Sequence, residues 1–248
     1  MIGILVAIVA LAHAIETMTG FGATVFALAA GSLVWPLDPL LAALIGLGWL
    51  QSAFIVTRNL RSVRARFLAR RVLPGAVAGM VAGRLVYDQL PVAHLRTLLG
   101  VFVVVAAGAR LWDLVRAQRR SAGATAPHAR SWARLLEILP FLGGVFHGLF
   151  ASGGPVIVYY TAARIADKRE FRATMSALWW ILNSGLLVWS AVAGSLGRAW
   201  PLAGWLLPGL AAGVVAGEWL HRTVREDLFR VVVQAVLLAI GCVLIGSG

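Results

Sequence analysis

The sequence predicts an all-α polytopic membrane protein made of two inverted repeats, each a broken-helix hairpin followed by three transmembrane helices. The first reason is composition, because 60% of the residues are hydrophobic, only 13% are charged, and the mean hydropathy is +0.86. The second reason is that two apolar stretches are each interrupted by a glycine turn, at residues 19–22 and 152–155. A broken helix in lipid needs protein or a wet cavity to receive its freed backbone groups.

The first repeat is expected over residues 1–115. Its apolar runs predict a hairpin at 2–35, formed by helices at 2–18 and 22–35, and then spans at 41–57, 72–87 and 96–115. The returning arm at 22–35 is too short to cross about 30 Å of hydrocarbon comfortably at 1.5 Å per residue. The first arm would be about 25 Å long, so a pair of short full spans is the alternative to a hairpin.

The second repeat is expected over residues 135–248. Its apolar runs predict a hairpin at 135–165, formed by helices at 135–150 and 155–165, and then spans at 172–195, 201–218 and 228–246. One sequence repeat links the halves directly, because Leu-Pro-Gly at 73–75 recurs at 207–209, and glycines follow both copies at the same spacing. Glycine at every fourth residue leaves a smooth stripe on a helix, so we expect these glycines to pack against another backbone.

The placement of basic residues favours hairpins over single crossings. If each broken region returns to its own side, the halves are inverted, and 19 of the 22 Lys and Arg residues face one side. If each broken region crosses once, the same residues divide 13 to 9. Lys and Arg concentrate in cytoplasmic loops. We therefore expect both termini outside and the basic segment 116–134 as a cytoplasmic connector between the repeats.

The remaining composition excludes several classes of protein. The net charge of +12 would suit nucleic acid only as a face on a soluble domain, whereas these basic residues lie between apolar spans, so no nucleic-acid partner is expected. The single cysteine, Cys242, excludes an intramolecular disulfide framework. The sequence shows no phosphate loop, nucleotide fingerprint or metal-ligand cluster, so we expect neither a cofactor nor a metal. The expected partners are the lipid bilayer and a small anion, and a homo-oligomer is left open.

The two glycine turns are the candidate substrate-binding sites. At each turn a second helix begins, and its free N–H groups together with the helix dipole suit an anion. Ser152 is a candidate N-cap of the later helix. The candidate binding residues are Thr19, Gly20, Phe21, Gly22, Ala23 and Thr24 at the first turn and Ser152, Gly153 and Gly154 at the second. Tight turns packed against neighbouring helices are the alternative, but two related breaks favour a shared transporter site between the halves.

Few polar or ionisable residues lie inside the apolar runs. A carboxylate at the centre of a span costs about 2.5 to 3.5 kcal/mol on insertion scales, so Glu16 should be protonated, paired or directed into a cavity. His13 shares a helix face with Glu16, and His147 precedes the second turn. With Asn183, they are candidates for proton coupling or gating, since histidine changes charge near physiological pH. Structural pairing is the alternative for His13 and Glu16, and packing is favoured for the deeply placed Trp179.

Three segments resemble a known family of permeases. The run at 16–24, reading ETMTGFGAT, the Leu-Pro-Gly at 73–75 and the run at 147–155, reading HGLFASGGP, are similar in order and spacing to the sulfite exporter TauE/SafE family. The resemblance covers nearly the whole chain. It implies a multi-pass permease of the bacterial inner membrane that moves sulfite, sulfoacetate or related sulfonates and has no enzyme activity.

The residues alone leave several functions open. The main hypothesis is export by alternating access, and the membrane potential could drive an anion outward, with about 2.3 kcal/mol per charge per 100 mV. An importer or uniporter of a different anion is one alternative. An intramembrane serine protease is another, because Ser152 with His147 or His13 superficially resembles a nucleophile and its base. A membrane scaffold without transport is the third.

Overall fold

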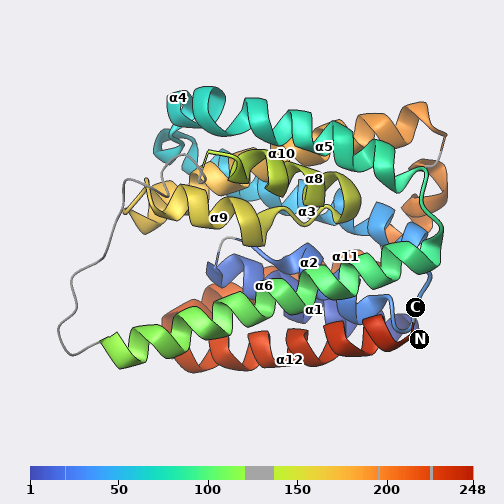
Figure 1. Cartoon of the computed structure of the whole chain (residues 1–248). Helices are drawn as coiled ribbons and strands as arrows, with labels where there is room; N and C mark the ends of the chain where they lie inside the picture. Colours follow the sequence, from blue (N-terminus) through green and yellow to red (C-terminus); the bar gives the residue numbers. More distant parts are fainter. Residues whose placement is uncertain (20, 121–136, 195, 224–225, 248) are drawn as a thin grey trace.

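A computed structural model of the chain describes residues 1–19, 21–120, 137–194, 196–223 and 226–247 (Figure 1). Over these residues all regular secondary structure is helical, and no strand is present. Four of the described helices are long and apolar enough to cross a membrane. The prediction of an all-α polytopic membrane protein is therefore confirmed. Gly20 and most of the predicted connector 116–134 lie outside the described residues.

The first half of the chain forms a short-armed hairpin and three longer helices. The main helices are α1 (Ile2–Thr19), α2 (Ala23–Gly31), α3 (Leu37–Asn59), α5 (Leu73–Tyr87) and α6 (Val92–Arg120). An irregular segment joins α3 to α5 through η1 (Leu60–Ser62), α4 (Ala65–Phe67) and η2 (Leu68–Val72). Pro74 lies in the first turn of α5, a position that tolerates its missing N–H, and α5 follows directly on η2.

The second half repeats this order of elements. Its helices are α8 (Leu139–Phe150), α9 (Gly154–Ala162), α10 (Lys168–Val192), α11 (Leu196–Thr223) and α12 (Glu226–Ser247). Asp167 caps α10, because its side chain accepts a hydrogen bond from the Glu170 N–H. Each helix that the apolar runs predict is present, with its ends shifted by no more than about five residues, within the usual error for element boundaries.

The helices differ in how far they can reach through a membrane. The long apolar segments are Leu37–Ser62, Val92–Trp112, Lys168–Val192 and Trp200–Trp219, in α3, α6, α10 and α11. Helices α2 and α9 have nine residues each, about 14 Å, and they pack against α1 and α8 respectively. Neither α2 nor α9 can cross the hydrocarbon core alone. Each therefore folds back along the helix before it.

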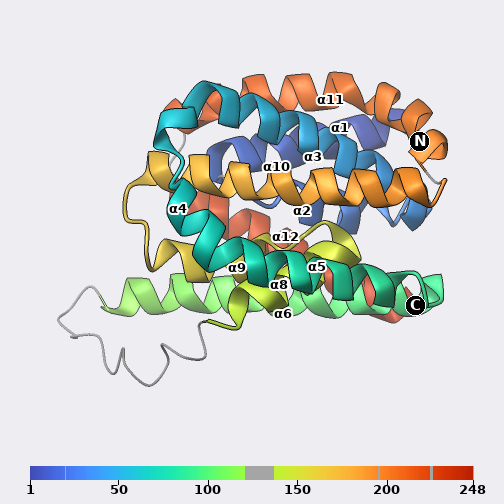
Figure 2. The same ribbon diagram turned by 90° about the horizontal axis from the view of Figure 1, so that it is seen from above.

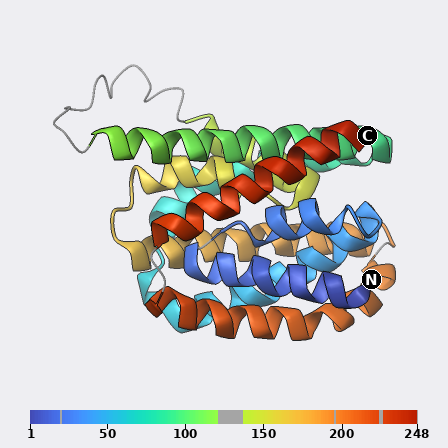
Figure 3. The same ribbon diagram turned by 90° about the horizontal axis from the view of Figure 1, so that it is seen from below.

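The two halves follow the same spacing along the chain. Helix α2 begins four residues after α1 ends, and α9 begins four residues after α8 ends. Helices also pair across the halves, α1 with α11, α8 with α5, α3 with α10 and α6 with α12 (Figures 2 and 3). Each of these pairs joins an element of one half to an element of the other. The division into two inverted repeats stays a prediction.

The repeated glycines lie where helices of the two halves meet. A Cβ added at Gly79 or Gly83 of α5 would come within 2.0 and 2.1 Å of carbonyl oxygens of α8. On the other side of the bundle, a Cβ at Gly213 of α11 would come within 2.4 Å of the carbonyl oxygen of Ala10 in α1. Only a hydrogen fits at these positions. The prediction that these glycines pack helix backbone against helix backbone is confirmed.

Charged side chains distinguish the two ends of the helix bundle. One end, here called the basic end, holds most of the described basic residues, namely Arg58, Arg61, Arg64, Arg66, Arg70, Arg71, Arg164, Lys168, Arg169 and Arg172. Arg64 forms an ion pair with Glu170 there at 2.8 Å. At the opposite end Arg84 pairs with Asp88 at 2.8 Å. Helix α9 ends at the basic end and α2 at the opposite end, so the two hairpins open in opposite directions (Figures 2 and 3).

Candidate functional site

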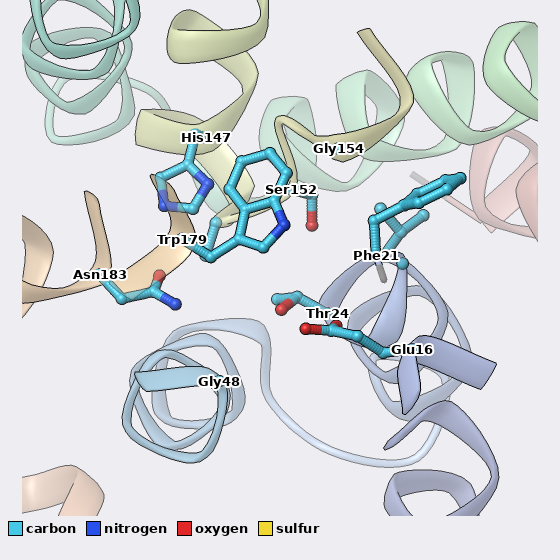
Figure 4. A pocket seen from close by; sticks show the side chains of 12 residues that line it. Glu16, Phe21, Thr24, Gly48, His147, Ser152, Gly154, Trp179 and Asn183 are labelled. Carbon is cyan, nitrogen blue, oxygen red and sulfur yellow. The ribbon is translucent and has the colours of Figure 1, made fainter. Parts of the chain in front are cut away.

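A small cavity lies between the two glycine turns, bounded by α3 and α10 (Figure 4). Twelve residues line it: Glu16, Phe21, Gly22, Thr24, Val25, Gly48, His147, Ala151, Ser152, Gly154, Trp179 and Asn183. Eight of them are candidate residues from the sequence, contributed by both halves of the chain. Turns that are far apart in the sequence therefore meet at one place.

At the first turn, one of the chain's own carboxylates occupies a helix start. Gly22 adopts φ 104° and ψ −6°, a left-handed conformation that favours glycine and lets α2 fold back along α1. Glu16 is 7% exposed, and its Oε2 accepts a hydrogen bond from the Ala23 N–H at 2.9 Å. The helix dipole and the free N–H groups stabilise a carboxylate at this position. Glu16 thus takes part of the helix start that the sequence analysis assigned to substrate.

The second turn has no carboxylate. Helix α8 ends in Ala151, at φ 50° and ψ 31°, and Gly153 is the N-cap of α9. The Ser152 hydroxyl donates a hydrogen bond to the Phe150 carbonyl at 2.8 Å, and no side chain caps α9. The prediction that Ser152 caps α9 is wrong, because its hydroxyl turns back to the preceding helix. The start of α9 faces the cavity through Gly154.

Three buried polar side chains of the cavity have atoms without a hydrogen-bond partner among the described residues. These atoms are both ring nitrogens of His147, Nε1 of Trp179 and Oδ1 of Asn183. His147 is 1% exposed and stacks on Trp179, with ring centroids 5.5 Å apart and planes 15° from parallel. Asn183 lies beside His147 without a well-formed hydrogen bond to it. Buried polar groups are nearly always paired, so this cluster can take water or a polar ligand as its partner.

Comparison with known proteins identifies the family. The sequence profile described as Sulfite exporter TauE/SafE matches residues 5–244. The chain belongs to the TauE/SafE family. It is also 29% identical, over 185 residues, to a protein of Comamonas testosteroni named probable inner membrane transporter protein TsaS. That match covers 74% of this chain and 73% of the relative, and no solved structure matches the chain.

Family membership establishes the general class of function. The chain is a membrane transporter of the TauE/SafE type, located in the inner membrane and crossing it several times. In many secondary transporters, broken helices in two halves of the chain surround the substrate site. The cavity between the two glycine turns is therefore the candidate functional site of this TauE/SafE protein.

The structure does not bring every candidate residue of this TauE/SafE protein to the cavity. Nδ1 of His13 pairs with the side-chain oxygen of Gln51 in α3, at 2.5 Å. Nε2 of Gln51 also donates to the hydroxyl of Thr17, at 3.1 Å. These bonds join α1 to α3, and His13 is not part of the cavity lining. Gly153 packs against α8, where an added Cβ would lie 2.3 Å from the carbonyl oxygen of Gly143.

The other candidates at the first turn are placed by the backbone. Ala23 is the first residue of α2 and contributes the N–H that Glu16 binds. Thr19 is the last residue of α1, and Gly20 lies outside the described residues. The lining of the cavity at this turn therefore comes from Phe21, Gly22 and Thr24.

Sequence reasoning missed part of the cavity wall of this TauE/SafE protein. It favoured packing for Trp179, whereas Figure 4 shows the indole nitrogen turned into the cavity. Trp179 and Asn183 are four residues apart on α10 and share a helix face, a spacing that could have revealed the pair. Gly48 gave no signal within its apolar run, yet a Cβ added there would lie 3.2 Å from Nδ2 of Asn183. Val25 and Ala151 complete the lining that was not foreseen.

Proposed function

We propose that this protein is a permease that exports small sulfur-containing anions, such as sulfite or organosulfonates, by alternating access. One observation supports the binding site most directly. Buried polar atoms of His147, Trp179 and Asn183 that have no hydrogen-bond partner in the described part of the chain line the same cavity between two glycine turns. The description of the matched family supports sulfite as a representative substrate. The name of the Comamonas testosteroni relative supports transport across the inner membrane.

The proposed site binds the anion through N–H donors, and its lining contains no Lys or Arg. The Trp179 indole supplies one N–H group and the His147 ring supplies another, whereas the unpartnered atom of Asn183 is Oδ1, an acceptor, so Asn183 contributes a donor only with its Nδ2 turned toward the anion. Gly22 and Gly154 line the cavity beside them and allow a ligand close to the backbone of both turns. A sulfite or sulfonate group presents three oxygens in a compact shape. Converging donors in a small cavity match that shape.

We also propose that the halves are inverted repeats and that the cavity opens to each side in turn. The hairpins α1–α2 and α8–α9 have the same spacing, open toward opposite ends, and pack against helices of the other half. Inverted repeats around a site at broken helices are typical of secondary transporters. On this proposal the basic end and the connector 116–134 face the cytoplasm, following the bias of Lys and Arg toward that side.

The geometry favours transport over proteolysis. A serine nucleophile needs a base within hydrogen-bond reach of its hydroxyl. The Ser152 hydroxyl instead donates to the Phe150 carbonyl, and neither ring nitrogen of His147 has a partner among the described residues. His13 is engaged by Gln51. We therefore propose that the chain has no enzyme activity.

Flux measurements in liposomes test this proposal with a matched pair of variants. Trp179→Phe removes an N–H donor from the cavity and keeps an aromatic ring. Trp180→Phe is the control, because that ring lies against Trp49 with centroids 6.4 Å apart and is 37% exposed. We expect Trp179→Phe to raise the half-saturating concentration of sulfite or methanesulfonate about five-fold, the worth of one hydrogen bond. Wild-type protein that moves none of sulfite, methanesulfonate and sulfate would contradict the proposed function.

A further inference from the structure

Glu16 places a carboxylate in a cavity that is proposed to hold an anion. It is the one carboxylate among the twelve lining residues, and none of these residues is Lys or Arg. The side chain is nine-tenths buried, and its Oε2 is bound to the Ala23 N–H at the start of α2. An anion in the cavity would therefore lie near an ionised Glu16 without a lining cation between them. Two like charges in a poorly solvated site repel each other strongly.

The charged groups around Glu16 do not remove this conflict. Arg172 of α10 interacts with Glu16 electrostatically, but it is also paired with Glu218 of α11, at 3.5 Å. Arg110 of α6 lies over the rings of Phe21 and Tyr159, with its guanidinium 5.4 and 4.4 Å from the two centroids. Neither arginine lines the cavity. The cavity itself therefore has too little positive charge for both a carboxylate and a bound anion.

The neighbouring helices add only neutral or titratable groups. His13, on α1 with Glu16, is bound to Gln51 of α3. Helix α2 has no ionisable residue, and α3 contributes Gly48 to the lining. His147 of α8 faces the cavity from the other side (Figure 4). Protonation is thus the simplest way for the cavity to accept an anion.

The two protonatable side chains of the cavity hold equivalent positions in the two hairpins. Glu16 lies three residues before the end of α1, and His147 lies three residues before the end of α8. Glu16 is hydrogen-bonded to its own helix start, whereas the His147 ring nitrogens have no partner among the described residues. One hairpin therefore offers a donor to the anion, and the other offers a site that can be neutralised by a proton.

We propose that Glu16 is a proton-binding site and that the anion crosses the membrane together with the proton on Glu16. This inference rests on the proposed function of the same cavity. The Glu16 carboxylate takes a proton from water on the side to which the cavity is open, and the neutral acid tolerates the anion beside it. After the cavity opens to the other side, the anion leaves and the proton returns to water there. One monoanion and one proton carry no net charge, so the pH gradient, and not the membrane potential, enters the driving force. An interior more alkaline than the outside opposes outward movement of the pair, so export on this proposal is driven by the outward concentration gradient of the anion.

Methanesulfonate is a suitable probe, because it stays a monoanion across the working pH range and its own titration cannot mimic coupling. The full chain is reconstituted into liposomes that contain a pH-sensitive dye, with the potential clamped by potassium and valinomycin. With the potential clamped at zero, a gradient of one pH unit should concentrate methanesulfonate about ten-fold on the alkaline side, the limit for one proton per anion. At equal pH, a change of potential should leave the flux unaltered.

Two variants separate coupling from general damage. Glu16→Gln imitates the protonated acid, so it should still exchange methanesulfonate across the bilayer while dye acidification is lost and flux becomes sensitive to potential. Glu170→Gln, which removes the partner of Arg64 outside the cavity, should keep the coupling of the wild type. Wild-type flux that follows the potential and moves no protons overturns the inference and leaves the proposed function intact. Wild-type protein without any anion flux overturns both.

Discussion

The two glycine turns have the same architecture and opposite chemistry. In each, a helix ends, four residues later a nine-residue helix begins, and the turn faces the shared cavity. The first turn holds the Glu16 carboxylate against the Ala23 N–H at 2.9 Å. The second holds His147, stacked on Trp179 and without a partner for its ring nitrogens among the described residues. At the first turn, the Glu16 side chain already binds an N–H group of the helix start. At the second turn, nitrogens of His147 and Trp179 have no hydrogen-bond partner among the described residues.

This difference suits the two turns to two different functions, anion binding and proton binding. A bound anion should lie nearer the second turn, where Nε1 of Trp179 and the ring nitrogens of His147 have no hydrogen-bond partner among the residues that the structure describes. The first turn should govern protonation through Glu16. Variants at the second turn should therefore impair anion binding more than variants at the first.

The largest expected effect concerns how each hairpin is held by the other half. Gly79→Ala places a Cβ 2.0 Å from an α8 carbonyl oxygen, and Gly213→Ala places one 2.4 Å from an α1 carbonyl oxygen. We expect each variant to lose about 2 to 3 kcal/mol of stability through overpacking, measured by thermal unfolding in detergent. Gly204→Ala on α11 is the control, because an added Cβ meets nothing within 4 Å. If Gly79→Ala unfolds at the wild-type temperature, the close α5–α8 packing is wrong.

A smaller effect is expected at the second turn. His147→Gln keeps a polar side chain in the cavity but cannot become a cation, so it should reduce methanesulfonate transport about ten-fold, the worth of one strong hydrogen bond, and change its pH dependence. His94→Gln, at an exposed position at the start of α6, is the matched control. Flux measured over a range of pH checks this result. An unchanged pH profile for His147→Gln would remove this histidine from the coupling hypothesis.

The smallest effect is expected at the first turn. Thr24 lines the cavity near Glu16, and Thr24→Val removes its hydroxyl with little change in volume. We expect about a two-fold rise in the half-saturating methanesulfonate concentration, less than for Trp179→Phe, since one neutral hydrogen bond at most is lost. Thr57→Val is the control, because that hydroxyl is exposed and bonds to the Phe54 carbonyl. A larger loss for Thr24→Val than for Trp179→Phe would place the anion at the first turn instead.

Most of the helices could be predicted from the sequence, because membrane spans are recognisable as long apolar runs. Both glycine turns could also be placed, since glycine and proline break such runs at definite residues. The short pieces of residues 60–72 were not foreseen, because their arginines and apolar residues form no clear period. Some helices extend into polar residues beyond the apolar run, as α6 does to Arg120, and others end before the apolar run does, as α2 does at Gly31.

The site was predicted less completely, because contacts between distant segments decide it. His13 has the same sequence setting as Glu16, yet Gln51, 38 residues away, binds it outside the cavity. Serine is a common N-cap residue, but the Ser152 hydroxyl donates its hydrogen bond to the Phe150 carbonyl instead. Trp179 looked like a packing residue until the fold turned its indole nitrogen toward the two turns. The local sequence indicates which residues could bind a ligand. The contacts that these residues make depend on how distant segments pack in the fold.

The most direct test of the anion site is an experimental structure of the protein with selenite, an analogue of sulfite whose selenium gives an anomalous signal. We expect one selenium peak in the cavity between the two glycine turns, with an oxygen of the anion within hydrogen-bond distance of Nε1 of Trp179. Trp179→Phe should weaken that peak at the same selenite concentration. A selenium peak elsewhere in the bundle, with this cavity empty at saturating selenite, would contradict the account.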